Sequence, residues 1–338
     1  MSQPGKVASA REFKAALCGN DPRQIDRVFG LGRRERLQGL TNVYPRLVTG
    51  ADFSGHAPDL QGIEALFSTW GMDEDLALKV RELPNLKIFF YAAGSVRHFA
   101  PALLERGILV VSAWAVNAVP VARFTLAQIL LSLKGYFRSL RELRLPGTEG
   151  TAPGIYLETV ALLGFGQVGR AVAELLRPFE LDVVVYDPFL PDAEALSLGL
   201  RKVTLEEAFS RALVVSNHLP DLESTRGMIR KEHFAALRPG AVFINTGRGA
   251  TVDEAGLAEI FAARGDLTAL LDVTHPEPPA PDSPLLTLGN IHISPHIAGS
   301  SGNEVVRMAD ACLEEFQAWR FGKPLRYQVT AGMLERMA

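Results

Sequence analysis

One histidine in the last third of the chain has the side chain and the position of a proton-transfer group. His296 follows the apolar run 291–294, which predicts a strand, and ligands of open α/β sheets bind just beyond strand ends. Imidazole exchanges a proton near neutral pH, so His296 is a candidate acid/base. Taken alone, the position suits a hydrogen-bonded structural loop histidine equally well. Weaker candidates among the seven histidines are His98, His218 and His275.

A carboxylate follows a second predicted strand. Glu277 comes after the apolar run 270–273, and prolines at 276, 278 and 279 stiffen its loop. Placed beside His296, the carboxylate would orient the imidazole and favour its protonated form. A solvated glutamate in a proline-rich turn is the alternative.

A guanidinium follows a third predicted strand. Arg248 comes after the apolar run 241–245 and stands between Gly247 and Gly249. Its planar fork suits bidentate contact with a substrate carboxylate and polarisation of an adjacent carbonyl. An arginine that caps the surface is the alternative.

The segment 160–171 contains a glycine pattern that suits a dinucleotide. An apolar strand leads into Gly164, Gly166 and Gly169, and a helix sequence follows. The first glycine permits a tight turn, the second leaves space for a pyrophosphate, and the third lets the helix pack closely on the strand. The helix N-terminus then offers N–H groups and partial positive charge to the phosphates. Such spacing alone is a weak signal, because glycines also serve ordinary turns.

An acidic residue after the next strand strengthens this interpretation. The run 183–186 ends on Asp187, eighteen residues beyond Gly169, where a carboxylate can bond both hydroxyls of an adenine ribose. Pro188 and Phe189 follow instead of an arginine suited to a 2′-phosphate, so NAD is favoured over NADP. The cofactor contacts predicted here are Gly164, Phe165, Gly166, Gln167, Val168, Gly169 and Asp187.

Two series of alternating elements would position these residues. Strands alternate with helix-length stretches, which predicts an α/β fold of parallel sheets covered by helices. The first series has strands at 63–69, 87–92 and 108–112 with helices at 73–83 and 100–106. The second follows the Pro/Gly-containing segment 145–154, with strands at 159–163, 183–186, 213–216, 241–245, 270–273 and 291–294. Long helices are predicted at 117–135, between the series, and at 303–322.

Composition limits the classes of protein. A chain of 338 residues with 47% hydrophobic residues suggests two domains with sizeable cores. The net charge of −3 without long like-charged blocks predicts neither nucleic acid nor membrane partners, and Arg33, Arg34 and Arg36 are interpreted as a solvated helix face. Cys18 and Cys312 have no metal-ligand spacing, so no metal is expected. The N-terminus lacks a targeting pattern, and we expect a cytoplasmic protein.

In order and spacing together, these motifs resemble the D-isomer-specific 2-hydroxyacid dehydrogenases. The resemblance covers about residues 60–325. It includes the glycine turn with Asp187, Asn-Thr-Gly-Arg-Gly at 245–249, the segment from Asp272 to Pro278, and Ser-Pro-His at 294–296. It is a phosphoglycerate dehydrogenase-like pattern of the short form, and no regulatory domain is expected because the chain ends soon after the final helix.

The resemblance implies an NAD-dependent oxidoreductase that interconverts a 2-oxo acid and a D-2-hydroxy acid. His296 would be the acid/base, Glu277 would sustain its basicity, and Arg248 would hold the substrate carboxylate. It adds cofactor contacts at His218, Leu219, Pro220, Thr225, Thr246, Gly247, Asp272 and His296. It implies substrate contacts at Ala93, Gly94, Ser95 and Arg248.

The resemblance also implies an architecture of two Rossmann-like or flavodoxin-like domains, with the cofactor domain inserted into a discontinuous substrate domain. The expected bounds are 1–116 with 299–338 for the substrate domain and 117–298 for the NAD-binding domain. An active site in the cleft and a homodimer are usual in this family.

The chain departs from the family in its substrate half. Ala93-Gly-Ser-Val-Arg-His98 stands where members often have Gly-Val-Asp-Asn. Arg97 would bind a second anionic group of the substrate or make a structural salt bridge, and Trp114 would narrow the pocket or pack in the core. The particular acid therefore stays open. An NAD-sensing, corepressor-like binding protein is the alternative function, and a formate dehydrogenase is disfavoured because that branch has glutamine in place of Glu277.

Overall fold

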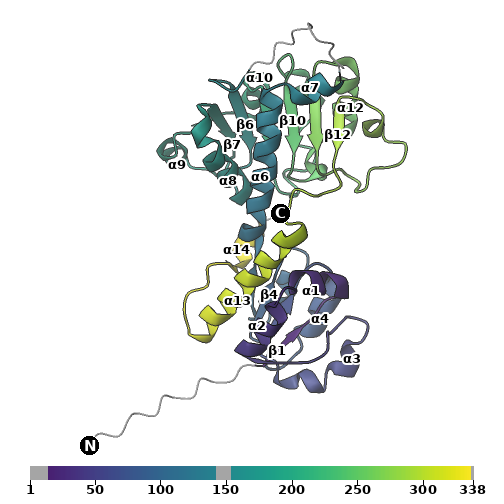
Figure 1. Ribbon diagram of the computed structural model, residues 1–338, viewed down its shortest axis with the longest axis vertical. Helices are drawn as coiled ribbons and strands as arrows, with labels where there is room; N and C mark the ends of the chain where they lie inside the picture. The colour runs from purple at the N-terminus through teal and green to yellow at the C-terminus, as the bar shows by residue number, and fades with distance from the viewer. Residues whose placement is uncertain (1–13, 142–153, 336–338) are drawn as a thin grey trace, which may run out of the picture. The chain divides into compact units, whose positions relative to one another are not determined.

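The structure is a computed structural model that describes residues 14–141 and 154–335 (Figure 1). The chain divides into two compact units, the first formed by Met1–Val116 with Gly302–Met337 and the second by Asn117–Ser301. The return to the first unit thus comes at residue 302, three residues later than the predicted 299. The predicted segment 145–154 lies outside the described residues except for Gly154.

The second unit contains a parallel sheet of seven strands (Figure 1). Its order is β12-β11-β10-β9-β6-β7-β8. From β6 the strands are added toward one edge as far as β8, and from β9 they are added toward the other edge, so the strand order reverses between β6 and β9. A crevice at such a reversal is where doubly wound folds bind nucleotides. The strands are β6 (Thr159–Leu163), β7 (Asp182–Tyr186), β8 (Arg201–Lys202), β9 (Val214–Asn217), β10 (Val242–Asn245), β11 (Thr268–Leu271) and β12 (Ile291–Ile293).

Both faces of this sheet are buried. Successive strand residues point to opposite faces, and in β6 Val160 packs into one core while Ala161 packs into the other. One face is covered by α6 (Trp114–Leu133), α8 (Gln167–Leu176) and α9 (Asp192–Ser197). The other is covered by α10 (Leu205–Arg211), α11 (Lys231–Ala235) and α12 (Glu254–Ala263). Because both faces are occupied, polar chemistry is confined to the strand ends.

The first unit contains a six-stranded sheet in the order β13-β5-β4-β3-β1-β2, in which β13 alone is antiparallel to its neighbour. The parallel part has the strand order of a flavodoxin-like sheet, as predicted. The strands are β1 (Lys14–Leu17), β2 (Asn42–Val43), β3 (Ala65–Ser68), β4 (Ile88–Tyr91), β5 (Leu109–Ser112) and β13 (Gln328–Val329). The helices packed on it are α1 (Pro22–Val28), α2 (Arg33–Leu40), α4 (Glu74–Val80), α5 (Ala100–Leu104) and α13 (Val306–Arg320).

The final long helix, α13, belongs to the first unit. Phe316 on this helix contacts Phe67 of β3 and Phe90 of β4, with ring centroids 5.4 and 5.8 Å away. All three rings are fully buried. Periodicity predicts the helix but not its partner, because an apolar face does not identify the sheet that buries it.

The interpretation of the N-terminal arginines as a solvated face is partly wrong. Arg33 and Arg36 on α2 both pair with Asp310 on α13, at 2.6 and 3.1 Å. Only Arg34 pairs locally, with Asp26 at 2.5 Å. The arginine cluster therefore joins α2 to α13, a contact between residues 270 or more positions apart that sequence spacing does not reveal.

Several elements differ from their predicted extents. The strands β1, β2, β8 and β13 are not among the predicted elements, and β2, β8 and β13 have only two residues each, too few to show a period. Strand β11 spans Thr268–Leu271, two residues before the predicted 270–273, because Asp272 begins the following loop. The helix α13 begins at Val306, not at residue 303, after a short 3-10 turn at Gly302–Val305.

One helix among the described residues, α6, is long and apolar enough to cross a membrane. Its residues Ala122, Ile129 and Leu133 are buried in the core of the second unit, and Thr125 hydrogen-bonds to Thr246 beyond β10. We therefore interpret α6 as a core helix.

We predict that Asp310→Ala lowers the stability of the first unit by about 1–2 kcal/mol, because it removes the shared partner of Arg33, which is partly buried, and Arg36, which is exposed. Differential scanning calorimetry of the whole chain would measure the change. Asp26→Ala is the matched control, since it removes an exposed pair with Arg34 and should cost less than about 1 kcal/mol. Equal losses in the two variants would contradict the role given to Asp310.

Candidate active site

Three loops at one edge of the second unit's sheet carry the predicted catalytic residues. Arg248 follows β10, Glu277 follows β11, and His296 follows β12. These strands are adjacent and parallel, so their carboxyl ends lie side by side. The sheet therefore places three segments that are 19 or more residues apart in sequence at a common edge.

The structure pairs His296 with Glu277. The Nδ1 atom of His296 lies 2.7 Å from Oε1 of Glu277, and the two side chains keep 49% and 43% of their surface exposed. A carboxylate at Nδ1 favours the tautomer with a proton on that nitrogen and leaves Nε2 available to a substrate. Solvent access at both residues is what a group that exchanges protons with a ligand requires.

The backbone of His296 has an unusual conformation. Its φ is +53°, in the left-handed region that residues other than glycine rarely adopt. The conformation is held by the N–H of His296, which donates to the carbonyl oxygens of Asp272 and Ser294 at 3.0 and 2.9 Å. Strain of this kind persists where the surroundings enforce it, often at functional sites.

Asp272 holds the same loop through its side chain. This residue is 2% exposed, and its carboxylate accepts hydrogen bonds from Ser294 Oγ at 2.6 Å and from the N–H groups of Ile297 and Ala298 at 2.9 Å each. Asp272 thus fixes the loop on both sides of His296. Its predicted contact with the cofactor stays a prediction.

The backbone at Arg248 is similarly restrained. Its carbonyl oxygen accepts hydrogen bonds from Thr251 Oγ1 at 2.7 Å and Asn245 Nδ2 at 3.3 Å. Burial lowers the pKa of the Arg248 guanidinium, and the carboxylates of Asp221 and Glu277 oppose this shift. Glu277 therefore interacts with both other members of the predicted set, with Arg248 through its charge and with His296 through a hydrogen bond.

The glycine turn after β6 has the geometry that a pyrophosphate needs. Gly164 has φ +88° and lies against the backbone of His218, where a Cβ would be 3.0 Å from the carbonyl. A Cβ on Gly169 would lie 2.2 Å from the carbonyl oxygen of Gly164, which leaves no space for a side chain. Gly166 instead faces open space and caps α8 without a side-chain hydrogen bond. The helix N-terminus is thus accessible to an anion.

Asp187 lies at the end of β7, beside this turn. Its carboxylate oxygens accept one hydrogen bond each, from the N–H of Phe165 at 2.6 Å and from the N–H of Phe189 at 2.7 Å. Each oxygen retains a lone pair for a ribose hydroxyl. The observed turn, open helix end and carboxylate together fit an adenine dinucleotide.

His218, beyond β9, is half-buried in a small polar network. Its Nε2 lies 3.0 Å from Ser216 Oγ and its Nδ1 lies 3.2 Å from Thr246 Oγ1, which also contacts Thr125 Oγ1 at 3.0 Å. Burial lowers the pKa of His218 to about 3, so the ring is neutral at physiological pH. The surroundings of His218 are therefore those of a structural residue and not those of an acid/base.

The other predicted cofactor contacts follow the same strand ends. Thr225 Oγ1 donates to the carbonyl of Pro220 at 2.5 Å and accepts the N–H of Leu222 at 2.9 Å, which closes the loop after β9. A Cβ on Gly247 would lie 3.0 Å from the carbonyl oxygen of Leu219, so the loops after β9 and β10 pack directly.

The predicted substrate contacts Ala93, Gly94 and Ser95 lie in the first unit, beyond the carboxyl end of β4. Ser112 Oγ, at the end of β5, donates to the carbonyl oxygens of Ala93 and Gly94 at 3.2 and 2.5 Å. Arg97, two residues after Ser95, is exposed.

Trp114 packs against Tyr327 with ring centroids 6.0 Å apart, which agrees with the interpretation of this tryptophan as a core residue.

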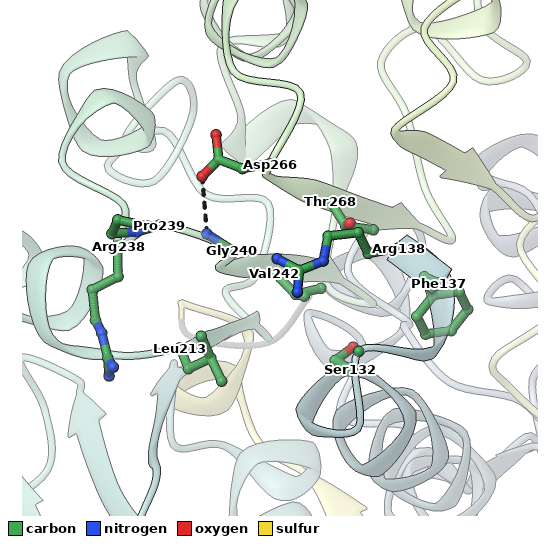
Figure 2. Close-up of a pocket in the computed structure, with 11 residues that line it drawn as sticks. Ser132, Phe137, Arg138, Leu213, Arg238, Pro239, Gly240, Val242, Asp266 and Thr268 are labelled. Atoms are coloured by element: carbon green, nitrogen blue, oxygen red, sulfur yellow. Dashed lines mark hydrogen bonds between the residues drawn. The ribbon is translucent and has the colours of Figure 1, made fainter. Parts of the chain in front are cut away.

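A cavity of about 280 Å³ lies at the opposite edge of the second unit's sheet (Figure 2). Leu213, Val242 and Thr268 line it at the amino ends of β9, β10 and β11, with Arg138 extending from α7 (Tyr136–Arg141). None of the predicted catalytic or cofactor residues lines this cavity. It is therefore separate from the candidate active site.

Comparison with protein families identifies the second unit. The family model described as "D-isomer specific 2-hydroxyacid dehydrogenase, NAD binding domain" matches residues 127–298. The chain belongs to this family. The match indicates NAD as the cofactor, in agreement with the turn at Gly164 and with Asp187.

Curated relatives and solved structures agree with this assignment. The D-3-phosphoglycerate dehydrogenase of Archaeoglobus fulgidus is 31% identical over 260 residues, covering 76% of this chain and 49% of the relative. This chain therefore spans about half the length of that relative. The structure of the TT0316 protein from Thermus thermophilus is 28% identical, with a TM-score of 0.68 and coverage of 94% of this chain and 100% of that chain.

A further solved structure supports the fold alone. The phosphoglycerate oxidoreductase from Rhizobium etli is 23% identical, with a TM-score of 0.78, and the alignment covers 96% of this chain and 100% of that chain. The predicted α/β class with two parallel-sheet domains is confirmed.

Sequence reasoning missed one contributor to the NAD-binding unit, Thr125, and one role of a residue that it did name, Asp272. Thr125 joins the His218 network, and an isolated threonine in an apolar helix is the signal that could have indicated it. Asp272 anchors the His296 loop, but the motif suggested only a contact with the cofactor. The partners of both residues lie on other elements, so spacing along the chain does not indicate them.

We predict that Asp187→Ala raises the dissociation constant for NADH about tenfold or more, because the ribose loses its charged acceptor. The constant for NADPH should change less, since the removed carboxylate repels a 2′-phosphate. Fluorescence titration measures both. Asp192→Ala is the control, because Asp192 is an exposed partner of Lys202 on the nearby α9. Unchanged NADH affinity in Asp187→Ala would contradict the assignment.

We predict that His218 makes the NAD-binding unit less stable in acid. Its pKa is about 3 in the folded protein against 6.5 ordinarily, so below pH 6.5 the unfolded chain binds a proton that the native state does not. This loss should approach about 1.4 kcal/mol per pH unit in the free energy of unfolding.

Urea unfolding of wild type and His218→Gln across this range would measure the difference in slope. His275→Gln, at an exposed histidine, should keep the wild-type slope. The same slope in His218→Gln and wild type would refute the neutral state of His218 in the folded protein.

Proposed function

We propose that this protein is an NAD(H)-dependent oxidoreductase that interconverts a 2-oxo acid and a D-2-hydroxy acid. The observation that carries the proposal is the 2.7 Å contact between His296 Nδ1 and Glu277 Oε1, in a family whose NAD binding domain the chain contains. A histidine paired with a carboxylate beside a dinucleotide turn suits a reaction that couples hydride and proton transfer.

His296 would act as the acid/base. In the reducing direction its Nε2 would donate a proton to the C2 oxygen of the substrate, and in the oxidising direction it would accept that proton. Glu277, bonded to Nδ1, would stabilise the protonated ring and keep its orientation. Bound NAD(H) supplies or accepts the hydride at C2.

Arg248 would bind the substrate carboxylate and polarise the C2 carbonyl. A guanidinium binds a carboxylate through two parallel hydrogen bonds, which also fixes the orientation of the substrate. The restrained carbonyl of Arg248 supports this role, because a positioned backbone limits where the guanidinium can reach. Backbone N–H groups near Gly94 and Ser95 would provide further carboxylate contacts.

The substrate is a small molecule of this acid class. The Archaeoglobus relative is named for D-3-phosphoglycerate, which makes that compound one candidate beside glyoxylate, hydroxypyruvate, pyruvate and phenylpyruvate. This chain spans about half the length of that relative. We therefore take from the name of the relative a compound to test, and we do not assign its substrate to this protein. We also propose a homodimer, supported by the family resemblance, and a cytoplasmic location, supported by two cysteines without disulfide or metal-ligand spacing.

We predict that the purified protein oxidises NADH with at least one of these 2-oxo acids, or reduces NAD with D-3-phosphoglycerate. His296→Ala should lower kcat by about 10²–10⁴-fold, because it removes the acid/base. Absorbance at the NADH band measures turnover. His292→Ala is the matched control, since His292 lies on β12 and packs against Phe137 without contacting Glu277.

Turnover in His296→Ala equal to that of wild type would contradict the role of the histidine. Tight NADH binding with no turnover on any of these acids would overturn the enzymatic proposal and favour an NAD-sensing binding protein.

A further inference from the structure

The loop that carries Glu277 has few backbone groups that can hold it in place. Prolines at 276, 278 and 279 have no N–H, so this stretch offers fewer donors than an ordinary loop. One remaining donor is the N–H of His275, two residues before Glu277. It donates to Oε1 of Glu254 at 2.7 Å. A side chain from another segment thus contacts the loop close to its functional residue.

Glu254 belongs to the segment that carries Arg248. It is the first residue of α12, six positions after Arg248, and follows the N-cap Asp253, whose carboxylate accepts the N–H of Gly256 at 3.0 Å. Asp253 is itself fixed, because its N–H donates to the carbonyl of Ile229 at 2.8 Å. The carboxylate of Glu254 is therefore presented from a well-anchored helix start.

A second contact joins the same two segments. Gly249, next to Arg248, lies directly against the backbone of Thr274, where a Cβ would be 2.1 Å from the Thr274 carbonyl carbon. The hydroxyl of Thr274 in turn donates to the carbonyl of Pro276 at 2.8 Å. Gly249, which has no side chain, allows the two loops to approach closely, and the Glu254 hydrogen bond holds them together.

We propose that Glu254 is a positioning residue, which fixes the Glu277 loop to the Arg248 segment and thereby maintains the pairing of Glu277 with His296. The proposal rests on the proposed function for its effect on rate but not for its effect on the loop. The side-chain oxygen of Glu254 pairs a backbone N–H of a loop whose prolines leave few other donors, so this hydrogen bond anchors the loop whether or not the carboxyl is ionised. Small displacements of catalytic groups reduce rates strongly, so the anchor matters for turnover.

The environment of Glu254 shows which variant separates its charge from its hydrogen bond. The residue is half-buried, and burial raises the pKa of its carboxyl to about 7, while the His275 N–H opposes that shift. Glutamine keeps an acceptor oxygen at the same distance along the side chain but cannot ionise. Alanine removes the acceptor altogether. The two substitutions therefore distinguish anchoring by the hydrogen bond from a requirement for charge.

The first measurement does not depend on activity. Hydrogen exchange of the NADH-bound full chain, followed in peptides covering 273–283, should be about tenfold faster in Glu254→Ala and near the wild-type rate in Glu254→Gln. Glu259→Ala is the matched control, because Glu259 lies on the same helix and makes an exposed pair with Lys231. Unchanged exchange in Glu254→Ala would overturn the proposal.

The second measurement is kinetic. Glu254→Ala should lower kcat by about tenfold to a hundredfold with little change in the KM for NADH, and Glu254→Gln should recover most of the rate. Faster loop exchange with unchanged kcat would overturn the positioning role. If wild type turns over none of the acids, the proposed function fails, and the exchange measurement still decides whether Glu254 anchors the loop.

Discussion

The chemistry of this protein depends on a parallel sheet that is buried on both faces. Helices cover the seven strands of the NAD-binding unit on each side, so apolar residues occupy the strand interiors and functional side chains can stand only at the strand ends. Since the strands run in one direction, every loop that follows a strand emerges at the same edge. Arg248, Glu277 and His296 lie together at that edge for this reason, although long segments of chain separate them.

Position at an edge is not sufficient for catalysis, and the loops are held by a set of specific contacts. Asp272 uses both carboxylate oxygens to fix the loop around His296. This loop holds the backbone of His296 in a left-handed conformation. Gly249 allows the neighbouring loop to approach closely, and Glu254 joins the two segments by a hydrogen bond. Each contact restricts the geometry of a group that the proposed reaction requires, so the stability of the loops and the rate of the reaction have common determinants.

The cofactor site follows from the same sheet at the point where its strand order reverses. The turn after β6 packs on the loop after β9 through Gly164 and the backbone of His218, which leaves the start of α8 open to an anion. His218, whose backbone contacts Gly164, is half-buried and neutral, so its ring adds no charge to this junction. The carboxylate of Asp187 lies beside this turn, at the end of the adjacent strand, where the predicted contact with a ribose would form.

The sequence by itself determined the α/β class, the glycine turn and the candidates Arg248, Glu277 and His296, because local periodicity, glycine spacing and residue type are properties of neighbouring positions. It did not determine the partners of those residues. That Glu277 meets His296, and that Asp272 and Glu254 hold their loops, depends on which strands are adjacent in the sheet, and adjacency is decided by tertiary packing. The resemblance anticipated the first of these pairings, but only the folded chain shows the distances on which the proposed chemistry rests.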